Sequence, residues 1–298
     1  MGTIPFLSAE DVVAAVGPAR AVGAIEAELR AGLDVASLPP RSAVPISNGE
    51  WLIMPAETST AVGIKALTVA PQNPARGLPR IQGLYVLYDR DTLAPTAVLE
   101  ASSLTAIRTP AVSVAAVRSR LGDGLRVVVF GAGPQALGHV ATLEAVARVD
   151  DVAHVGRTSR PGVVAADDPA LPELLAQADV IVAATTARSP VFDSRPVSDT
   201  AVVIAVGSHE AAARELDTAL LARAQVVVED PATALREAGD VVIAVAEGAL
   251  DPGSLVALSD VVRGEVPLAT TRPVVFKSTG MAWEDLVIAE LAYRLARF

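Results

Sequence analysis

The sequence contains no cysteine, few aromatic residues and no excess of basic charge. Without cysteine there is no disulfide, thiol nucleophile or thiolate metal site, which fits a reducing cytoplasm. The formal net charge of -10 and the aromatic content of 3% argue against nucleic acid as a partner. A nucleic-acid surface needs clustered Lys and Arg. A small molecule is therefore the expected ligand.

Long hydrophobic runs are also missing. The apolar stretches near Ile181, Ile204 and Ile243 are shorter than the roughly 20 residues that a membrane-spanning helix needs. The amino-terminal stretch MGTIPFLSAEDVV lacks the basic and then apolar segments of a signal peptide. The three histidines are dispersed, with no metal-ligand spacing, so we expect no metal. The sequence thus predicts a soluble cytoplasmic protein without a membrane partner.

The pattern of hydrophobic residues changes near residue 120. Before it come a helical stretch at 8–32 and short segments at 50–56, 61–69 and 82–89, which are typical of antiparallel strands. After it, apolar strands alternate with helical patterns, and the five strands are RVVVFGAG, VAHVGRT, DVIVAATT, AVVIAVGS and QVVVED. This alternation predicts a parallel sheet covered on both faces. The final residues, 281–298, have the apolar spacing of a long amphipathic helix.

A glycine-rich turn joins the first of these strands to a helical stretch. Gly131, Gly133 and Ala136 form the pattern Gly-x-Gly-x-x-Ala, directly after RVVVF and directly before QALGHVATLEAVAR. Gly131 permits a tight turn, Gly133 lets the backbone approach a pyrophosphate, and Ala136 lets the helix pack closely on the strand. The free N–H groups and the dipole of the helix stabilise the phosphate charge. We therefore predict a Rossmann dinucleotide-binding domain and a nicotinamide cofactor, against the alternative of a purely structural turn.

The end of the second strand indicates which nicotinamide cofactor is bound. NAD-binding domains place an acidic residue about 20 residues beyond the glycines, and NADP-binding domains place Arg there. Here the strand leads into Arg157, Thr158, Ser159 and Arg160, with no carboxylate. Guanidinium groups and hydroxyls suit a 2′-phosphate, so we predict NADPH, with NADH possible. The alternative is a solvated basic loop.

The first half of the chain is expected to hold the substrate. Lysine occurs only at positions 65 and 277, and Lys65 lies inside the apolar segment AVGIKALTV. A buried cation costs free energy unless it is paired, and charge-assisted bonds to a carboxylate contribute about 1.5–3 kcal/mol each. Lys65, Arg41 and Arg108 are therefore candidates for binding a small acid. The alternative is internal pairing with carboxylates such as Glu57 or Asp89.

Several motifs occur in one order along the chain: LSAEDV, PPR at 39–41, LIMPA, GIKALTVAPQNPARGLP, LTAIRTPAVS, VVFGAGPQALGH, AVGSHEAAARELD and KSTGMAWEDL. In these motifs the chain resembles the ornithine cyclodeaminase/mu-crystallin family over almost its full length. The resemblance implies an α/β protein in which residues 1–112 and 275–298 form an α+β substrate-binding and dimerisation domain with an antiparallel sheet. It implies a Rossmann domain at 113–274. It also implies a homodimer in which the antiparallel sheets of two subunits pack together.

The same resemblance assigns residues to the site. Arg41, Lys65 and Arg108 match the positions that bind the substrate carboxylate. Near the cofactor the resemblance places Thr109, Gln135, Arg157, Thr185, Val206 and Ser278.

Two departures from the family pattern bear on the reaction. Ornithine cyclodeaminases carry a Glu three residues before the Pro of the Met-Pro motif and an Asp in a Gly-Gly-Asp or Gly-Ala-Asp segment. This sequence has Leu52 and His209 at those positions. Glu50 is close to Leu52 in the sequence, but in an extended strand two residues lie about 7 Å apart along the strand. Glu50 is therefore not counted as a substitute for the missing Glu. Because both carboxylates are lost, the chain resembles the reductases of the family more than the lyases.

The predicted reaction is reduction of a small, cyclic imine with a 2-carboxylate, giving an amino acid such as proline or pipecolate. Arg41, Lys65 and Arg108 would hold the carboxylate, and Lys65 and His209 are the candidate catalytic residues. Because histidine is the residue type suited to proton transfer near neutral pH, His209 would protonate the imine or stabilise the cofactor end of the pocket, unless it is simply a hydrogen-bonded residue at a strand end. His139 and His154 are expected to be structural. An amino-acid dehydrogenase, a cyclodeaminase-type lyase using bound NAD and a non-catalytic NADPH-binding protein remain alternatives.

Overall fold

The computed structural model describes residues 3–296 and divides into two compact units. One unit contains the chain up to Thr109 and again from Met281 onward, and the other is Pro110–Gly280. The predicted outer domain limits and the predicted carboxy-terminal helix include residues 1, 2, 297 and 298, which lie outside the described residues. The roles expected for the two domains, substrate binding with dimerisation and cofactor binding, stay predictions.

The first unit is built on a six-stranded sheet. Its spatial order is β1 (Phe6–Leu7), β6 (Pro95–Glu100), β5 (Ile81–Asp89), β4 (Ala61–Val69), β3 (Gly49–Glu57) and β2 (Ser42–Ile46). Neighbouring strands are antiparallel, apart from β1, which runs parallel to β6. Strand β4 buries every second residue, Lys65 among them, because successive side chains point to opposite faces. We call the face that carries Lys65 the inner face and the opposite one the outer face.

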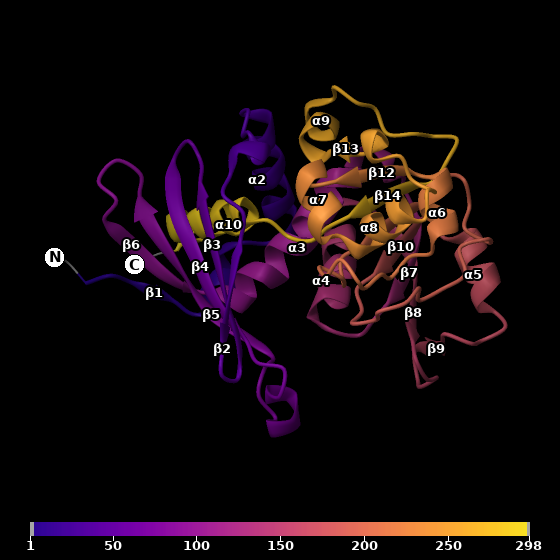
Figure 1. Cartoon of the computed structure of the whole chain (residues 1–298), viewed down its shortest axis with the longest axis horizontal. Helices are drawn as coiled ribbons and strands as arrows, with labels where there is room; N and C mark the ends of the chain where they lie inside the picture. Colours follow the sequence, from indigo (N-terminus) through magenta and orange to yellow (C-terminus); the bar gives the residue numbers. More distant parts are fainter. Residues whose placement is uncertain (1–2, 297–298) are drawn as a thin grey trace. The chain divides into compact units, whose positions relative to one another are not determined.

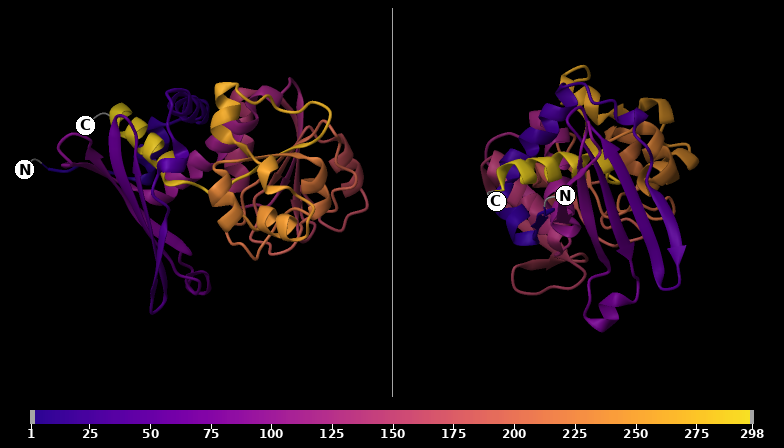
Figure 2. Two further views of the ribbon diagram at one scale, coloured as in Figure 1. Left: turned by 45° about the horizontal axis from the view of Figure 1, so that its top comes forward. Right: turned by 90° about the vertical axis from the view of Figure 1, so that its left-hand side faces the viewer.

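Three helices pack together on the side of the inner face. They are α1 (Ala9–Ala15), α2 (Pro18–Arg30) and α10 (Ala282–Leu295). Helix α10 packs against β3, β4 and α2, and lies on the same side of the sheet as α2 (Figures 1 and 2). The helical stretch expected at 8–32 is therefore two helices. Gly17 and Pro18 separate them, because Pro18 has no N–H to continue α1 and instead occupies the first position of α2.

The second unit is built on an eight-stranded sheet in which all strands are parallel. Its spatial order is β13 (Val256–Ala257), β12 (Gln225–Val228), β14 (Val274–Lys277), β11 (Val202–Ala205), β10 (Val180–Ala183), β7 (Leu125–Phe130), β8 (Val149–Gly156) and β9 (Val163–Ala165). The central strands are buried along their whole length, which explains their continuous apolar sequences. The predicted α/β class, with a parallel sheet and a second antiparallel one, is confirmed. Strands β9, β13 and β14 were not among the five predicted.

The helices of the second unit follow its strands, as in other doubly wound folds (Figure 1). They are α4 (Pro134–Val146), α5 (Leu171–Gln177), α6 (Thr218–Arg223), α7 (Pro231–Glu237), α8 (Gly239–Ala246) and α9 (Leu258–Arg263). Helix α3 (Ala101–Val117) runs from the first unit into the second. Within residues 3–296, 3-10 helices at Val35–Ser37, Asn73–Arg76, Arg118–Arg120 and Pro252–Ser254 complete the elements.

The order of the strands fixes where a dinucleotide can bind. The run β9-β8-β7-β10-β11 has the 3-2-1-4-5 arrangement of doubly wound folds, and the direction of winding reverses between β7 and β10. Ligands of such sheets bind beyond the carboxyl ends of the strands at this reversal. Among residues 3–296, no helix combines the length and the hydrophobicity needed to cross a membrane.

Candidate active site

The glycine-rich turn lies at the point where the winding of the sheet reverses. Gly131 has φ of 118°, and a Cβ placed on it would lie 2.4 Å from the carbonyl oxygen of Ala184, which follows β10. Only glycine fits both constraints. Gly133 precedes α4 as its N-cap, without a side-chain cap, and the space that a Cβ would fill there is open. The backbone at Gly133 can therefore approach a pyrophosphate, and the turn fits the predicted cofactor.

The first turn of α4 contains the other two residues assigned to this end of the cofactor. Ala136 is fully buried, with its Cβ 3.6 Å from the position a Cβ would take on Gly131. The carbonyl oxygen of Gln135 accepts a hydrogen bond from His139 Nδ1 at 2.7 Å, and His139 Nε2 lies 2.9 Å from Ser113 Oγ of α3. Burial lowers the pKa of His139 to about 4, against a weaker opposing effect of the Gln135 carbonyl, so the ring is neutral at pH 7. His139 thus links α3 to the first turn of α4.

The basic turn after β8 lies on the surface of the second unit. Arg157, Thr158 and Arg160 are all exposed. Two backbone hydrogen bonds between Arg160 and Val163, at 2.8 and 3.2 Å, close the turn. Because β8 is the neighbour of β7, this turn follows the strand where a dinucleotide fold binds the adenine ribose. Its position therefore suits a 2′-phosphate, and the cofactor preference stays a prediction.

The remaining cofactor candidates of the second unit follow the carboxyl ends of three neighbouring strands. Thr185 follows β10, Val206 follows β11 and Ser278 follows β14. The backbone N–H of Val206 donates to the Ala183 carbonyl, and that of Ser278 donates to the Ala205 carbonyl. The remaining candidate, Thr109, lies buried in α3 at the end of the first unit.

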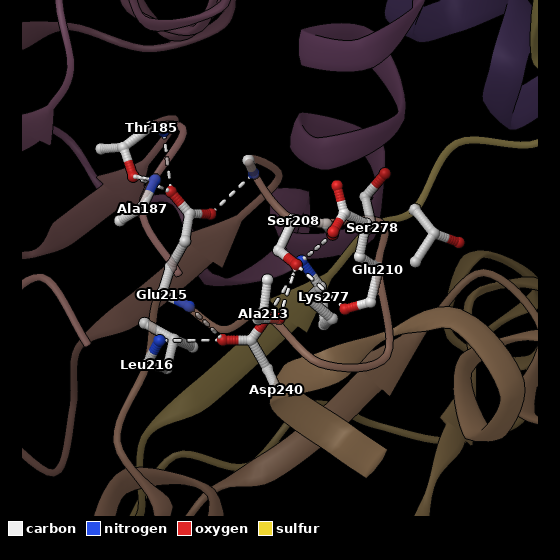
Figure 3. Close-up of polar contacts among 12 residues, drawn as sticks. Thr185, Ala187, Ser208, Glu210, Ala213, Glu215, Leu216, Asp240, Lys277 and Ser278 are labelled. Atoms are coloured by element: carbon white, nitrogen blue, oxygen red, sulfur yellow. Dashed lines mark hydrogen bonds and ion pairs between the residues drawn. The ribbon is translucent and has the colours of Figure 1, made fainter. Parts of the chain in front are cut away.

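The hydroxyl groups of Thr185 and Ser278 donate to buried carboxylates that the sequence did not single out. Thr185 Oγ1 donates to Glu215 Oε1 at 2.7 Å, and Ser278 Oγ donates to Glu229 Oε1 at 2.5 Å. Figure 3 shows Glu215 with its partners. Glu229 also accepts the backbone N–H groups of Thr279 and Gly280, both at 2.9 Å. These acids hold the backbone beyond the strands in place, and nothing in the local sequence marks them for that role.

Lys65 and Arg108 are brought together in the first unit, with carboxylates beside them. Lys65 Nζ lies 2.8 Å from Asp285 Oδ1 and also donates to Thr105. Arg108 lies 2.6 Å from Glu284 Oε2 and 3.6 Å from Asp285 Oδ1. All four charged side chains are buried. Burial lowers the pKa of Lys65, and the charge of Asp285 opposes this shift.

The alternative of internal pairing with a carboxylate is confirmed for Lys65, but the partner is Asp285 and the expected partners Glu57 and Asp89 were wrong. Glu57 is paired in register with Val62, which places it on the outer face, and it forms an ion pair with Arg90 at 3.0 Å. Asp89 instead accepts hydrogen bonds from Thr92 at the end of β5. The actual partners come from α10, which covers the inner face.

Tyr85 and Gly63 lie beside Lys65 on the inner face. Tyr85 lies opposite Lys65 in the pairing of β4 with β5 and is fully buried. A Cβ on Gly63 would lie 2.2 Å from the Tyr85 hydroxyl, so glycine is needed there. Burial, with a smaller contribution from Asp285, raises the pKa of Tyr85 well above its ordinary value, so the phenol stays protonated.

The other candidates lie on other elements of the two units. Arg41 is half-buried and immediately precedes β2, which is separated from the strand of Lys65 by β3. Leu52 lies on β3 two residues from Met54, the register partner of Lys65, and so faces the same side. Glu50 shares that face but pairs with Val69 at the other end of β4. His209 is exposed in the segment after β11, in the second unit, and His154 is half-buried in β8.

A doubly wound sheet with an intact glycine turn, joined to a unit with buried cations, is typical of dinucleotide-dependent enzymes and does not identify one reaction. Comparison with known proteins narrows the range of possible enzyme families. The model of the ornithine cyclodeaminase/mu-crystallin family matches residues 5–297, and the chain belongs to this family.

Three similar proteins are informative. A Delta(1)-pyrroline-2-carboxylate/Delta(1)-piperideine-2-carboxylate reductase of Azospirillum brasilense is 31% identical, over 98% of this chain and 96% of that one. The structure of Thermococcus litoralis Delta(1)-pyrroline-2-carboxylate reductase with NADH and L-proline has a TM-score of 0.89 and 27% identity, covering 98% and 97%. An archaeal alanine dehydrogenase dimer with bound NAD has a TM-score of 0.88 and 26% identity, covering 98% and 96%. They confirm the predicted class, an NAD(P)H-dependent oxidoreductase acting on C=N or CH–NH bonds.

Proposed function

We propose that the protein is an NADPH-dependent reductase of small cyclic imines with a 2-carboxylate, producing an amino acid such as proline or pipecolate. The observation that carries this proposal is the buried cluster of Lys65, Arg108, Glu284 and Asp285 on the inner face of the sheet. A protonated cyclic imine with a carboxylate carries one positive and one negative charge. The cations of the cluster can pair with the carboxylate of such a molecule, and its carboxylates can pair with the protonated imine nitrogen.

The binding roles follow from this charge pattern. Lys65 and Arg108, with Arg41, hold the substrate carboxylate, which orients the C=N carbon and supplies positioning as part of the rate enhancement. A bound nicotinamide supplies the hydride that reduces that carbon. His209 is the proposed proton source for the imine nitrogen, since a protonated imine accepts hydride more readily.

The substitutions at the two cyclodeaminase positions support reduction over deamination. Leu52 lies on the inner face, on the strand next to that of Lys65, and supplies an apolar side chain where the lyases carry Glu. The relatives named as reductases of pyrroline and piperideine carboxylates support the same substrate class. The NADPH preference rests on Arg157, Thr158 and Arg160, whereas the similar solved structures contain NADH or NAD.

We further propose a homodimer formed through the outer face of the six-stranded sheet, in the cytoplasm. The register of the strands places large apolar side chains on this face, and several are exposed: Phe6, Val44, Trp51 and Leu84. An exposed apolar face of this extent marks an interaction surface. The dimeric state of the similar alanine dehydrogenase supports a second copy of the chain as the partner.

The test is consumption of NADPH, followed by absorbance, with five- and six-membered cyclic imine 2-carboxylates and with NADH in parallel. NADPH oxidation that depends on the imine, and that is slower with NADH, is the expected result. Ammonia release from ornithine without net cofactor turnover would instead identify a cyclodeaminase. Oxidation that requires an open-chain 2-keto acid and ammonia would identify an amino-acid dehydrogenase.

A further inference from the structure

Three ionisable side chains lie buried together in the second unit, near the carboxyl ends of its central strands. Glu215, Asp240 and Lys277 are each no more than 1% exposed. None of them belongs to the residues predicted to bind cofactor or substrate. Figure 3 shows them in one connected set of polar contacts with the segments that follow β10 and β11.

The carboxylate of Glu215 connects the two segments directly. Its Oε1 accepts the backbone N–H and the hydroxyl of Thr185, both at 2.7 Å. Its Oε2 accepts the backbone N–H of Gly207 at 2.6 Å. Thr185 follows β10 and Gly207 follows β11, so the two oxygens hold neighbouring backbone segments at a fixed separation.

The close approach at Gly207 depends on the absence of a side chain. A Cβ there would lie 2.0 Å from the Thr185 carbonyl oxygen and 2.4 Å from Glu215 Oε1. Neither contact is compatible with any other residue unless one of the two segments moves. The glycine and the carboxylate together therefore set the spacing between Thr185 and Gly207.

Asp240 and Lys277 hold Glu215 in turn. Asp240 Oδ1 accepts the backbone N–H groups of Glu215 and Leu216, both at 2.8 Å. Lys277 Nζ forms an ion pair with Asp240 Oδ2 at 3.1 Å and donates to the carbonyl oxygen of Ser208 at 2.6 Å. The ammonium group thus compensates the buried carboxylates and also holds the segment after β11.

The contacts favour the ionised form of Glu215. A carboxylate offers acceptor sites on both oxygens, and all three groups facing it are donors. Burial raises the pKa of Glu215, while the charge of Lys277 and the hydrogen bonds from Thr185 and Gly207 oppose that shift. Glutamine has nearly the same shape, but its NH2 group would face a donor in place of one acceptor oxygen.

We propose that Glu215 is a positioning residue of the cofactor site: its carboxylate, held by Asp240 and Lys277, sets the arrangement of the backbone after β10 and β11 on which the dinucleotide rests. This inference relies on the proposed function for the identity of the ligand. Glu215 acts through Thr185 and Gly207 and does not itself contact the cofactor.

The experiment compares the wild-type protein with Glu215→Gln and with the control Glu173→Gln, whose side chain is exposed in the first turn of α5. Fluorescence titration with NADPH and NADH measures affinity, and hydrogen exchange of the apoprotein measures protection of the Thr185 and Gly207 amides. Loss of charge-assisted hydrogen bonds predicts a Kd about tenfold higher or more, with faster exchange at both amides. Glu173→Gln is expected to match the wild type in both measurements.

The outcomes separate this inference from the proposed function. Wild-type protein that binds neither cofactor overturns both. Wild-type binding combined with a folded Glu215→Gln that keeps the affinity and the slow exchange overturns only the positioning role. Should Glu215→Gln fail to fold, Thr185→Val decides, because it removes the hydroxyl donor and keeps the backbone N–H. Because Thr185 is itself a predicted cofactor residue, the exchange readout decides: faster exchange at the Gly207 amide supports the role of Glu215, and wild-type exchange there overturns it.

Discussion

Lys65 and Asp285, 220 positions apart in the chain, form a buried ion pair with 2.8 Å between Nζ and Oδ1. The strand β4 supplies the lysine and the helix α10 supplies the aspartate. Removing one partner of a buried pair leaves an uncompensated charge, so the two residues act as one unit. The pairing also keeps a cation on the inner face, where we propose that the substrate carboxylate binds.

Replacement of Lys65 by Met separates substrate binding from cofactor binding. Met fills a similar volume without the charge, so we expect turnover to fall by about a hundredfold or more, since charge-assisted bonds to a carboxylate are strong. The affinity for NADPH, measured by fluorescence titration, should stay near the wild-type value because Lys65 lies outside the second unit. Equal losses of turnover and cofactor affinity would contradict the role assigned to Lys65.

Replacement of Asp285 by Asn tests whether Asp285 keeps Lys65 positively charged. The negative charge of Asp285 raises the pKa of Lys65 against the effect of burial, and its removal lets that pKa fall further. The fraction of charged Lys65 then declines as the pH rises, so KM for the imine should increase toward high pH more steeply than in the wild type. Glu57→Gln, which alters an exposed ion pair on the outer face, is the control. Parallel KM profiles for wild type and Asp285→Asn would exclude this coupling.

Replacement of Arg157 or Arg160 by Ala tests the cofactor preference. Each guanidinium is expected to contribute a charge-assisted bond to the 2′-phosphate, so kcat/KM with NADPH should fall by about tenfold or more. The same constant with NADH, which lacks the phosphate, should change little. Arg195→Ala, which removes an exposed ion pair with Asp193 elsewhere in the second unit, serves as the control. A matching decline with both cofactors would instead indicate a general effect on the domain.

A charge on the outer face of the six-stranded sheet tests the proposed dimer. Leu84 lies on the central strand β5 and is 46% exposed in the single chain. A Glu at this position would be buried without a partner in a sheet-to-sheet interface, so sedimentation equilibrium should detect monomers. Val13→Glu places the same charge on an exposed position of α1 and should leave the oligomeric state unchanged. If the Leu84→Glu variant kept the oligomeric mass of the wild type, the dimer interface would lie elsewhere on the protein.

The parts of the fold that local sequence determines were predictable. The turn at Gly131 and Gly133 follows from residue type and its position between a strand and a helix, and the buried strands follow from apolar runs. The separation of α1 from α2 was signalled by Gly17 and Pro18, although the apolar spacing on both sides favoured one helix. The two-residue strand β13 has too few residues to show any periodicity.

The partners of the buried charges were not predictable from local sequence. Glu284 and Asp285 lie in the amphipathic pattern of α10, where acidic residues normally face solvent. Their burial results from α10 packing on a sheet whose strands come from the other end of the chain. Glu215 likewise receives its hydrogen bonds from two separate segments, so its role depends on strand order rather than on neighbouring residues.

The buried ring of His139 predicts a pH dependence of stability. Its pKa falls from 6.5 to about 4 on folding, so the unfolded chain binds more protons between these values. The free energy of unfolding therefore declines as the pH falls from 6.5 to 4, by about 3 kcal/mol from this residue. Urea unfolding across this range should show a shallower decline for His139→Gln. Ser113→Ala keeps the buried ring and should retain the wild-type slope. Identical slopes for wild type and His139→Gln would assign the acid sensitivity to other groups.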